Sequence, residues 1–188
     1  VKIRSHAGKL WFAAPPLIKR GPLPSSDVDL IAQGLGVARA DIVAHAWCDN
    51  GPNWRAVMLS TAEQVLAIRP NAQILAGLDV GVVGPRQKVG VIAPQATSAH
   101  AAPGDELASD FEVRAFFPTL TGMTEDPVTG SLNAGLASWL IGAGLAPTSY
   151  IAAQGTALGR SGRVHVEAVD DDIWIGGHTV TCIDGLLL

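Results

Sequence analysis

The amino-acid sequence predicts an α+β fold in which many short strands accompany two or three helices. Apolar stretches of strand length, bounded by glycine, proline or aspartate, recur along the whole chain. Helix signals are few, and helices and strands do not alternate regularly, which argues against a repeating βαβ architecture. Of the 188 residues 48% are hydrophobic and 16% are charged, so the chain can bury a sizeable core, as one domain or two small ones.

The first third of the chain predicts one strand and one helix. Residues 8–16, "GKLWFAAPP", alternate large side chains and end in two prolines, which is typical of a strand that stops abruptly. Residues 26–35 carry apolar side chains on one side at helical spacing. We expect a short amphipathic helix there, with Ser26 as its N-cap and Gly36 as its C-terminal stop.

The middle of the chain predicts further strands and a second helix. Residues 54–59, "WRAVML", favour a strand that leads into a helix ending after Ile68. Ser60 and Glu63 have the spacing of a capping box at the start of that helix. Residues 111–117, "FEVRAFF", predict a half-buried strand, because apolar side chains recur at every second position. Two more stretches rich in β-forming residues are predicted strands: residues 78–84 and 88–94.

An uncharged tract follows the acidic pair Glu125 and Asp126. No Asp, Glu, Lys or Arg occurs between Pro127 and Arg160. A transmembrane helix, a helix buried on all sides and irregular structure are the three alternatives for this tract. Asparagine, glutamine, proline and several glycines interrupt it, and small residues are frequent. We therefore interpret residues 131–142 as a helix buried on all sides.

The last part of the chain predicts an antiparallel meander of short strands. Glycine or aspartate lies near the ends of successive stretches, as tight turns require. The predicted strands are residues 149–155, 162–169, 172–177 and 178–183.

The start of the predicted buried helix is a candidate anion site. Thr129 or Ser131 would cap the helix, and the free N–H groups of its first turn would carry partial positive charge. Such a position suits a substrate carboxylate or a developing enolate oxygen. Asp126 lies beside it and is a candidate for moving protons, because burial and N–H contacts change the proton affinity of a carboxylate. The alternative is that Asp126 is a turn or capping residue, as Asp before Pro often is.

Residues 154–166, "QGTALGRSGRVHV", form a second candidate segment. Gly155 and Gly162 allow tight backbone turns, and Arg160 could hold an anion. The spacing is that of neither a phosphate-binding loop nor a dinucleotide fingerprint. An ordinary hairpin loop is the alternative.

Charge and cysteine content exclude several classes of function. The net charge is −4 and the 13 Lys and Arg residues are dispersed, so no nucleic-acid partner is expected. Cys48 and Cys182 lie far apart without further ligands at metal-binding spacing. They argue against a disulfide scaffold or a metal site and favour a reducing, cytoplasmic location. The first residues lack the apolar segment of a signal peptide, and no membrane partner is expected.

Three separate segments, "VRAFFP", "EDPVTGSLNAGLASWL" and "QGTALGRSGRVHV", together resemble the PhzF-like isomerases of phenazine biosynthesis. That family has the diaminopimelate-epimerase-like fold. The resemblance therefore implies two similar domains, each a curved, mostly antiparallel sheet around a central helix, with the active site in the cleft between them. It implies that residues 1–45 are the end of a partial first domain and the crossover, and that residues 46–188 are a complete second barrel.

The resemblance also implies roles for the candidate residues. Asp126 would be the catalytic residue that transfers a proton. The implied reaction is an isomerisation without cofactor or metal, in which a proton is moved on a small carboxylate-bearing metabolite. A homodimer is implied as well. The residues implied in substrate binding are Thr129, Gly130, Ser131, Gly155, Arg160 and Gly162.

The chain departs from the family pattern in its first domain. Family members carry a general-base glutamate and a Gly-His motif there, and neither is present in this part of the chain, where His6 does not follow a glycine. The resemblance therefore covers roughly the C-terminal two thirds of a member. We expect no isomerase activity from these residues alone, and a partner chain that supplies the missing N-terminal third. The alternative is a non-catalytic module that binds small ligands or proteins.

Overall fold

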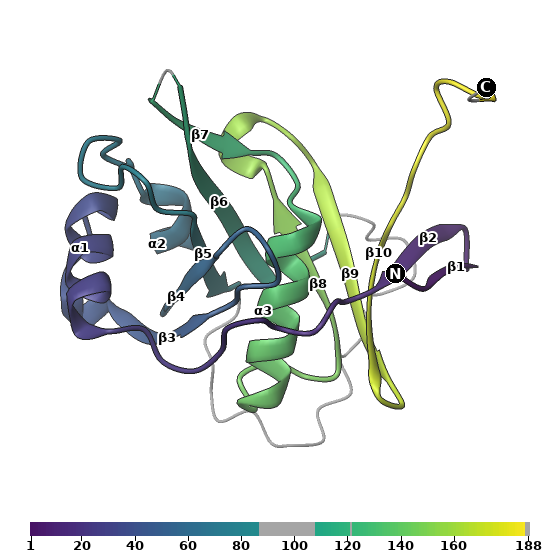
Figure 1. Cartoon of the computed structure of the whole chain (residues 1–188), viewed down its shortest axis with the longest axis horizontal. Coiled ribbons are helices and arrows are strands. Elements are labelled where there is room, and N and C mark those ends of the chain that lie inside the picture. The colour runs from purple at the N-terminus through teal and green to yellow at the C-terminus, as the bar shows by residue number, and fades with distance from the viewer. Residues whose placement is uncertain (87–107, 121, 187–188) are drawn as a thin grey trace.

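The computed structural model describes residues 1–86, 108–120 and 122–186 of the chain. Within these residues one ten-stranded sheet has the order β1-β2-β10-β9-β8-β6-β5-β4-β3, and β7 pairs with β6 beside that path (Figure 1). The strands are β1 (Ile3–His6), β2 (Lys9–Ala13), β3 (Ile42–Trp47), β4 (Arg55–Leu59), β5 (Val80–Pro85), β6 (Phe111–Thr119), β7 (Gly122–Asp126), β8 (Ser149–Gln154), β9 (Gly162–Val169) and β10 (Asp172–Gly177).

Most neighbouring strands of the sheet are antiparallel. The pairs β4–β5 and β6–β8 are parallel. The strand path is open, with β1 and β3 at its two ends. The predicted α+β class is confirmed. The division into a partial domain before residue 46 and a complete one after it stays a prediction, and strand β3 runs across that boundary.

The α-helices of the described residues lie on the two faces of this sheet (Figure 1). They are α1 (Ser25–Leu35), α2 (Ala62–Ala67) and α3 (Gly130–Gly142). α3 shares one apolar core with side chains from β4, β5, β6, β8, β9 and β10. α1 and α2 share the other core with side chains from β3, β4, β5 and β6. The buried helix predicted at residues 131–142 is confirmed, and it begins one residue earlier.

α3 is buried because its side chains are apolar or small on almost all sides of the helix. Leu132, Leu136 and Leu140 are at most 1% exposed, and burial of each such leucine contributes about 2 kcal/mol. A Cβ on Gly135 would lie 2.5 Å from the carbonyl oxygen of Cys48, so this glycine permits the close approach of helix and loop. In the described part of the chain no helix is long and apolar enough to cross a membrane.

Strand β6 corrects the prediction of a half-buried strand. α3 covers one of its faces and α2 the other, so Glu112 and Arg114 are as buried as their apolar neighbours. Glu112 pairs with Arg86, and Arg114 pairs with Glu125. Buried charges are tolerated only with such partners. Alternation along a strand shows which residues share a face, but it does not show that the second face is also covered.

The first helix differs from its prediction at one end. α1 begins at Ser25, directly after Pro24, and no side chain caps it, so Ser26 is not the N-cap. The fixed φ of proline already places the chain for the first turn. Gly36 ends the helix as predicted, in the left-handed region with φ 69°.

The second helix has its capping box one residue later than predicted. The Thr61 hydroxyl accepts from the Gln64 amide at 3.3 Å, and the Gln64 side chain accepts from the Thr61 amide at 3.2 Å. Ser60 and Glu63 do not form this pair. The sequence contains two overlapping matches to the motif, and the helix begins at the second.

The predicted strand at residues 178–183 is wrong. β10 already pairs with β2 on one side and with β9 on the other, so the segment that follows cannot form a hairpin with it. Val180 and Ile183 are exposed there. The predicted strand at residues 88–94 lies outside the described residues. Strands β1, β3 and β7 were not predicted from the sequence.

Candidate functional site

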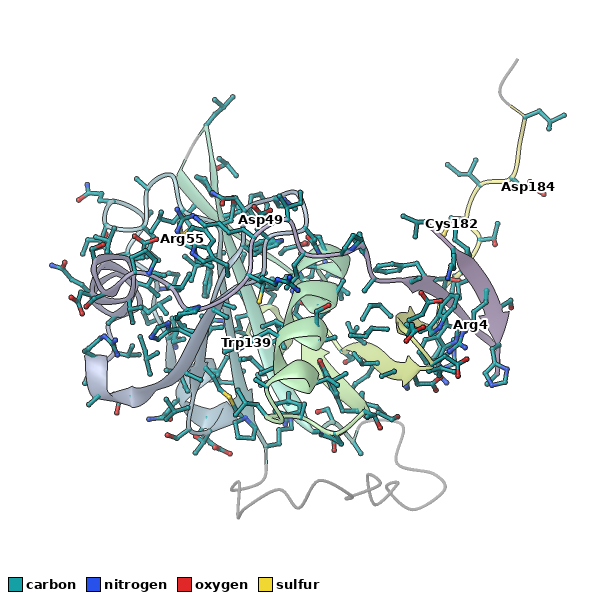
Figure 2. All side chains as sticks on the ribbon, turned by 60° about the horizontal axis from the view of Figure 1, so that its bottom comes forward. Arg4, Asp49, Arg55, Trp139, Cys182 and Asp184 are labelled. Carbon is teal, nitrogen blue, oxygen red and sulfur yellow. The ribbon has the colours of Figure 1, made fainter. Side chains whose placement is uncertain are left out.

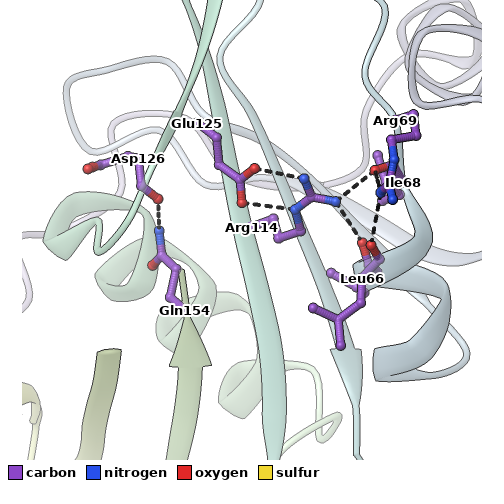
Figure 3. Close-up of polar contacts among 8 residues, drawn as sticks. Leu66, Ile68, Arg69, Arg114, Glu125, Asp126 and Gln154 are labelled. Atoms are coloured by element: carbon purple, nitrogen blue, oxygen red, sulfur yellow. Dashed lines mark hydrogen bonds and ion pairs between the residues drawn. The ribbon is translucent and has the colours of Figure 1, made fainter. Parts of the chain in front are cut away.

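The acidic pair at the end of β7 is divided between the two faces of the sheet. Glu125 accepts two hydrogen bonds from Arg114, at 2.9 and 2.7 Å (Figure 3). Asp126 lies on the α3 side, where its Oδ2 accepts from the Thr129 hydroxyl at 2.7 Å. Successive side chains of a strand point to opposite faces, which explains the separation. Glu125 and Asp126 are therefore adjacent in sequence but belong to different environments.

The ion pair with Arg114 gives Glu125 a structural role. The Arg114 guanidinium also donates to the carbonyl oxygens of Val65 and Ile68 at the end of α2, at 3.1 and 2.9 Å (Figure 3). The carboxylate of Glu125 thus balances a buried cation that anchors a helix end. Of the two carboxylates, only Glu125 is in this ion pair, and Asp126 has no such counter-charge among the described residues.

A buried amide chain connects Asp126 to the start of α3. Gln154 is fully buried, and its Oε1 accepts from the Thr129 amide at 3.1 Å and from the Asn133 side chain at 2.7 Å. Its Nε2 donates to the Asp126 carbonyl at 2.9 Å (Figure 3). It also donates to the Thr129 hydroxyl oxygen at 2.9 Å. All hydrogen-bonding positions of the amide are used, so its orientation is determined by its partners.

The direction of these hydrogen bonds is determined as well. Because the Thr129 hydroxyl oxygen accepts from Gln154, its own proton is donated to Asp126. Thr129 occupies the N-cap position of α3, but its side chain makes no cap hydrogen bond. The predicted capping role of Thr129 is therefore replaced by a role in holding Asp126. No described residue bonds Oδ1 of Asp126, so this oxygen is open to a ligand.

The loop from Gly155 to Gly162 packs directly on the turn that follows Asp126. Gly155 has φ 87°, and a Cβ there would lie 2.7 Å from the Pro127 carbonyl oxygen. A Cβ on Gly162 would lie 2.6 Å from the Gln154 carbonyl oxygen. Both glycines are required by this close approach, and the backbone there leaves no room for side chains.

Arg160 lies at the exposed side of this loop. Its amide donates to the Gly155 carbonyl at 2.9 Å, and its guanidinium makes no ion pair with any described residue. It remains a candidate for binding an anion.

The first turn of α3 carries the other predicted binding residues. The hydroxyl oxygen of Ser131 accepts from the indole N–H of Trp54 at 3.0 Å, and its carbonyl accepts from Asn50 at 2.8 Å. Ser131 is thus inside the helix and does not cap it. The ring of Phe12 from β2 lies 3.4 Å from the position a Cβ would take on Gly130, so it flanks the helix start.

The structure therefore brings the predicted residues around one end of α3, and it adds three that the sequence did not single out. The sequence pattern indicates only interruptions of an uncharged tract at Gln154 and Asn133, and a core residue at Trp54. A polar amide within an uncharged tract was the available signal, since buried polar groups need partners. A depression of about 670 Å³ lies at the opposite end of α3, beside Trp139 (Figure 2), and does not include these residues.

Cys48 and His165 are among the titratable side chains whose pKa is shifted. Burial raises the pKa of the Cys48 thiol to about 12, so this cysteine is a neutral core residue beside Gly135. Burial, with the nearby Lys9 charge, lowers the pKa of His165 to about 4. Neither group lies among the residues around Asp126.

The chain is similar to one protein family and to several solved structures. The model of the family PhzC-PhzF, described as phenazine biosynthesis-like protein, matches residues 4–185. No curated protein matches the chain.

Solved structures of similar fold are longer than this chain. A PhzF-family phenazine biosynthesis protein from Enterococcus faecalis is 25% identical, with a TM-score of 0.61, over 93% of this chain and 56% of that one. A PhzF-family protein from Bacillus anthracis is 15% identical, with a TM-score of 0.65, over 94% and 60%. A predicted epimerase from Pseudomonas aeruginosa is 19% identical, with a TM-score of 0.62, over 94% and 58%. The chain spans less than two thirds of the length of each of these structures. Since the family model covers nearly all of its residues, the chain belongs to the phenazine biosynthesis-like PhzC-PhzF family.

Proposed function

We propose that this protein is a cofactor-independent isomerase that moves a proton on a small carboxylate-bearing metabolite. The observation that carries the proposal is the state of Asp126: one carboxylate oxygen is held by Thr129 and the other has no described partner. A carboxylate oriented in this way can take a proton from carbon or return one. Membership of the PhzC-PhzF family and the similarity to a predicted epimerase support an isomerase.

The substrate's polar end is assigned to the start of α3. Thr129, Gly130 and Ser131 surround this position, and the backbone of Gly155 and Gly162 closes around the turn before it. Helix N-terminal N–H groups stabilise negative charge that develops on an oxygen when a neighbouring carbon loses its proton. Exposed Arg160 supplies a cation near the same loop. The proton removed from one carbon and the proton delivered to another balance, so no redox partner is needed.

We assign the second proton-transfer group to a residue that is not among these 188 residues. The proposal is supported by the length of the similar structures, of which the chain spans 56% to 60%. We propose that another chain supplies this group, and assembly as a homodimer is a second way to complete the cleft. We propose that the described residues bind and orient the substrate and contribute Asp126.

The test begins with native mass spectrometry of the purified protein, to establish whether a second polypeptide accompanies the 19.5 kDa chain. The resulting assembly is then incubated with but-3-enoate in D₂O and followed by proton NMR. Isomerisation to but-2-enoate removes a proton from C2 and places deuterium on C4. Asp126→Asn is expected to lower this rate at least about 100-fold. Exposed Asp184 (Figure 2) provides the matched control Asp184→Asn, which should leave the rate unchanged.

Two outcomes would contradict the proposal. Full exchange in Asp126→Asn would remove Asp126 from the reaction while leaving the fold unaffected. Binding of carboxylates without any exchange, in an assembly that contains a second chain, would favour the alternative of a non-catalytic binding module.

A further inference from the structure

We infer that Trp54 is a positioning residue that directs the hydroxyl proton of Ser131 toward an oxygen of the substrate. The inference rests on the proposed function, in which Ser131 contacts the substrate's carboxylate. It adds a residue from a distant part of the sequence, in the loop before β4, to the binding site at the start of α3.

The chemistry of the contact determines its direction. An indole N–H can donate but cannot accept, so the Ser131 hydroxyl oxygen is the acceptor at 3.0 Å. The hydroxyl proton must then point away from Trp54. No hydrogen bond of the described residues uses this proton, and it is available to an acceptor that enters from outside.

A second serine of the same helix shows the usual alternative. Ser138 donates its hydroxyl proton to the carbonyl oxygen of Ala134, four residues earlier, at 3.0 Å. Ser131 is in the first turn, and the residue four positions before it, Pro127, lies outside the helix. The helix backbone therefore does not take up the proton of Ser131 as it takes up that of Ser138.

Hydrogen bonds within the loop before β4 restrain the position of Trp54. Trp54 is 3% exposed, and its carbonyl accepts from the Cys48 amide at 2.9 Å, which closes the loop. Within the loop, the carboxylate of Asp49 (Figure 2) accepts from the amides of Gly51 and Asn53, at 2.8 and 3.1 Å. These bonds hold the backbone of the loop, and burial together with the bond to Ser131 holds the indole against α3.

The same loop contacts Ser131 a second time. The side-chain amide of Asn50 donates to the Ser131 carbonyl at 2.8 Å. The serine is therefore held at its backbone by Asn50 and at its hydroxyl by Trp54. A donor that is held before the substrate arrives loses less conformational entropy on binding, which is the advantage of a positioning residue.

The experiment measures binding of benzoate, a small planar carboxylate, by following amide resonances of ¹⁵N-labelled protein. Ser131→Ala and Trp54→Phe are each expected to weaken benzoate binding about three- to tenfold, the range of one hydrogen bond. The double variant should bind no more weakly than Ser131→Ala alone, because Trp54 acts through Ser131. Ser138→Ala and Trp139→Phe are matched controls on the same helix, and they should bind benzoate like the wild type.

A measurement on the wild type does not depend on the folding of the Trp54 variant. When Ser131 donates to benzoate, its oxygen becomes a better acceptor, so the indole N–H resonance of Trp54 should shift. In Ser131→Ala, the same resonance should not respond to benzoate.

The outcomes separate the inference from the proposed function. Unchanged benzoate binding in Ser131→Ala, or no binding to the wild type, counts against the proposed binding role of Ser131, and the inference falls with it. Weaker binding in Ser131→Ala with unchanged binding in Trp54→Phe overturns the inference alone. Additive losses in the double variant, or an indole resonance that ignores benzoate in the wild type, also overturn it.

Discussion

Glu125 and Asp126 are neighbours in β7, yet Glu125 is ion-paired to Arg114 on one face and Asp126 is bonded to Thr129 on the other. This separation divides the acidic pair into a structural carboxylate and one available for proton transfer. The same change from carboxylate to amide should therefore cost much more stability at Glu125 than at Asp126.

Glu125→Gln is expected to destabilise the protein by about 3 kcal/mol, because it leaves the buried Arg114 cation without its counter-charge. Asp126→Asn should change the free energy of unfolding by less than about 1 kcal/mol, since a single hydrogen bond is altered. Urea unfolding measures both. Glu167→Gln, at the more exposed pair with Arg4, is the control and should cost less than Glu125→Gln. Equal losses at positions 125 and 126 would contradict this division.

Thr129→Val removes the hydroxyl that links Gln154 to Asp126 while keeping the shape of the side chain. Both partners lose a hydrogen bond, so we expect a loss of about 1–3 kcal/mol in unfolding free energy. Deuterium exchange into but-3-enoate should slow about tenfold, because the carboxylate is no longer held. Thr129→Ser keeps the hydroxyl and should restore the exchange rate. Equal exchange rates in the valine and serine variants would show that Thr129 does not orient Asp126.

Gly135→Ala tests the close approach of α3 to the loop at Cys48. A Cβ at this position would meet the Cys48 carbonyl oxygen at 2.5 Å, so helix or loop must move, at a cost of about 1–3 kcal/mol. Gly142, the last residue of α3, has open space around it. Gly142→Ala should therefore be neutral or stabilise by up to about 1 kcal/mol through helix propensity. Thermal unfolding of the two variants checks the difference in sign.

The lowered pKa of His165 should make the folded protein less stable in mild acid. Burial lowers its pKa from 6.5 to about 4 in the folded chain. Between these two values the unfolded chain binds a proton that the folded chain does not, so the free energy of unfolding falls as pH decreases from about 6.5 to about 4. His165→Gln removes this contribution and should flatten the pH profile of urea unfolding in that window. A profile that is unchanged by the substitution would contradict the assignment.

The sequence alone determined the features that depend on local pattern. The uncharged tract specifies α3, because a helix without a polar face is stable only inside a core. Gly36 ends α1 since glycine adopts the left-handed conformation without cost. Asp126 was a candidate for proton transfer from its place before the helix, and Gly155 and Gly162 were expected in tight turns. Their roles in catalysis and binding are implied by the family resemblance and stay predictions.

The tertiary structure decided which groups are free and which are occupied, because that depends on partners far apart in the chain. Arg114 occupies Glu125 and leaves Asp126 open. Gln154 reaches Thr129 across 25 positions, and Trp54 reaches Ser131 across 77. Covering β6 on both faces turned a predicted half-exposed strand into a buried one. Hydrogen-bond satisfaction in a core is a property of the packed molecule, since water would satisfy the same groups in any isolated segment.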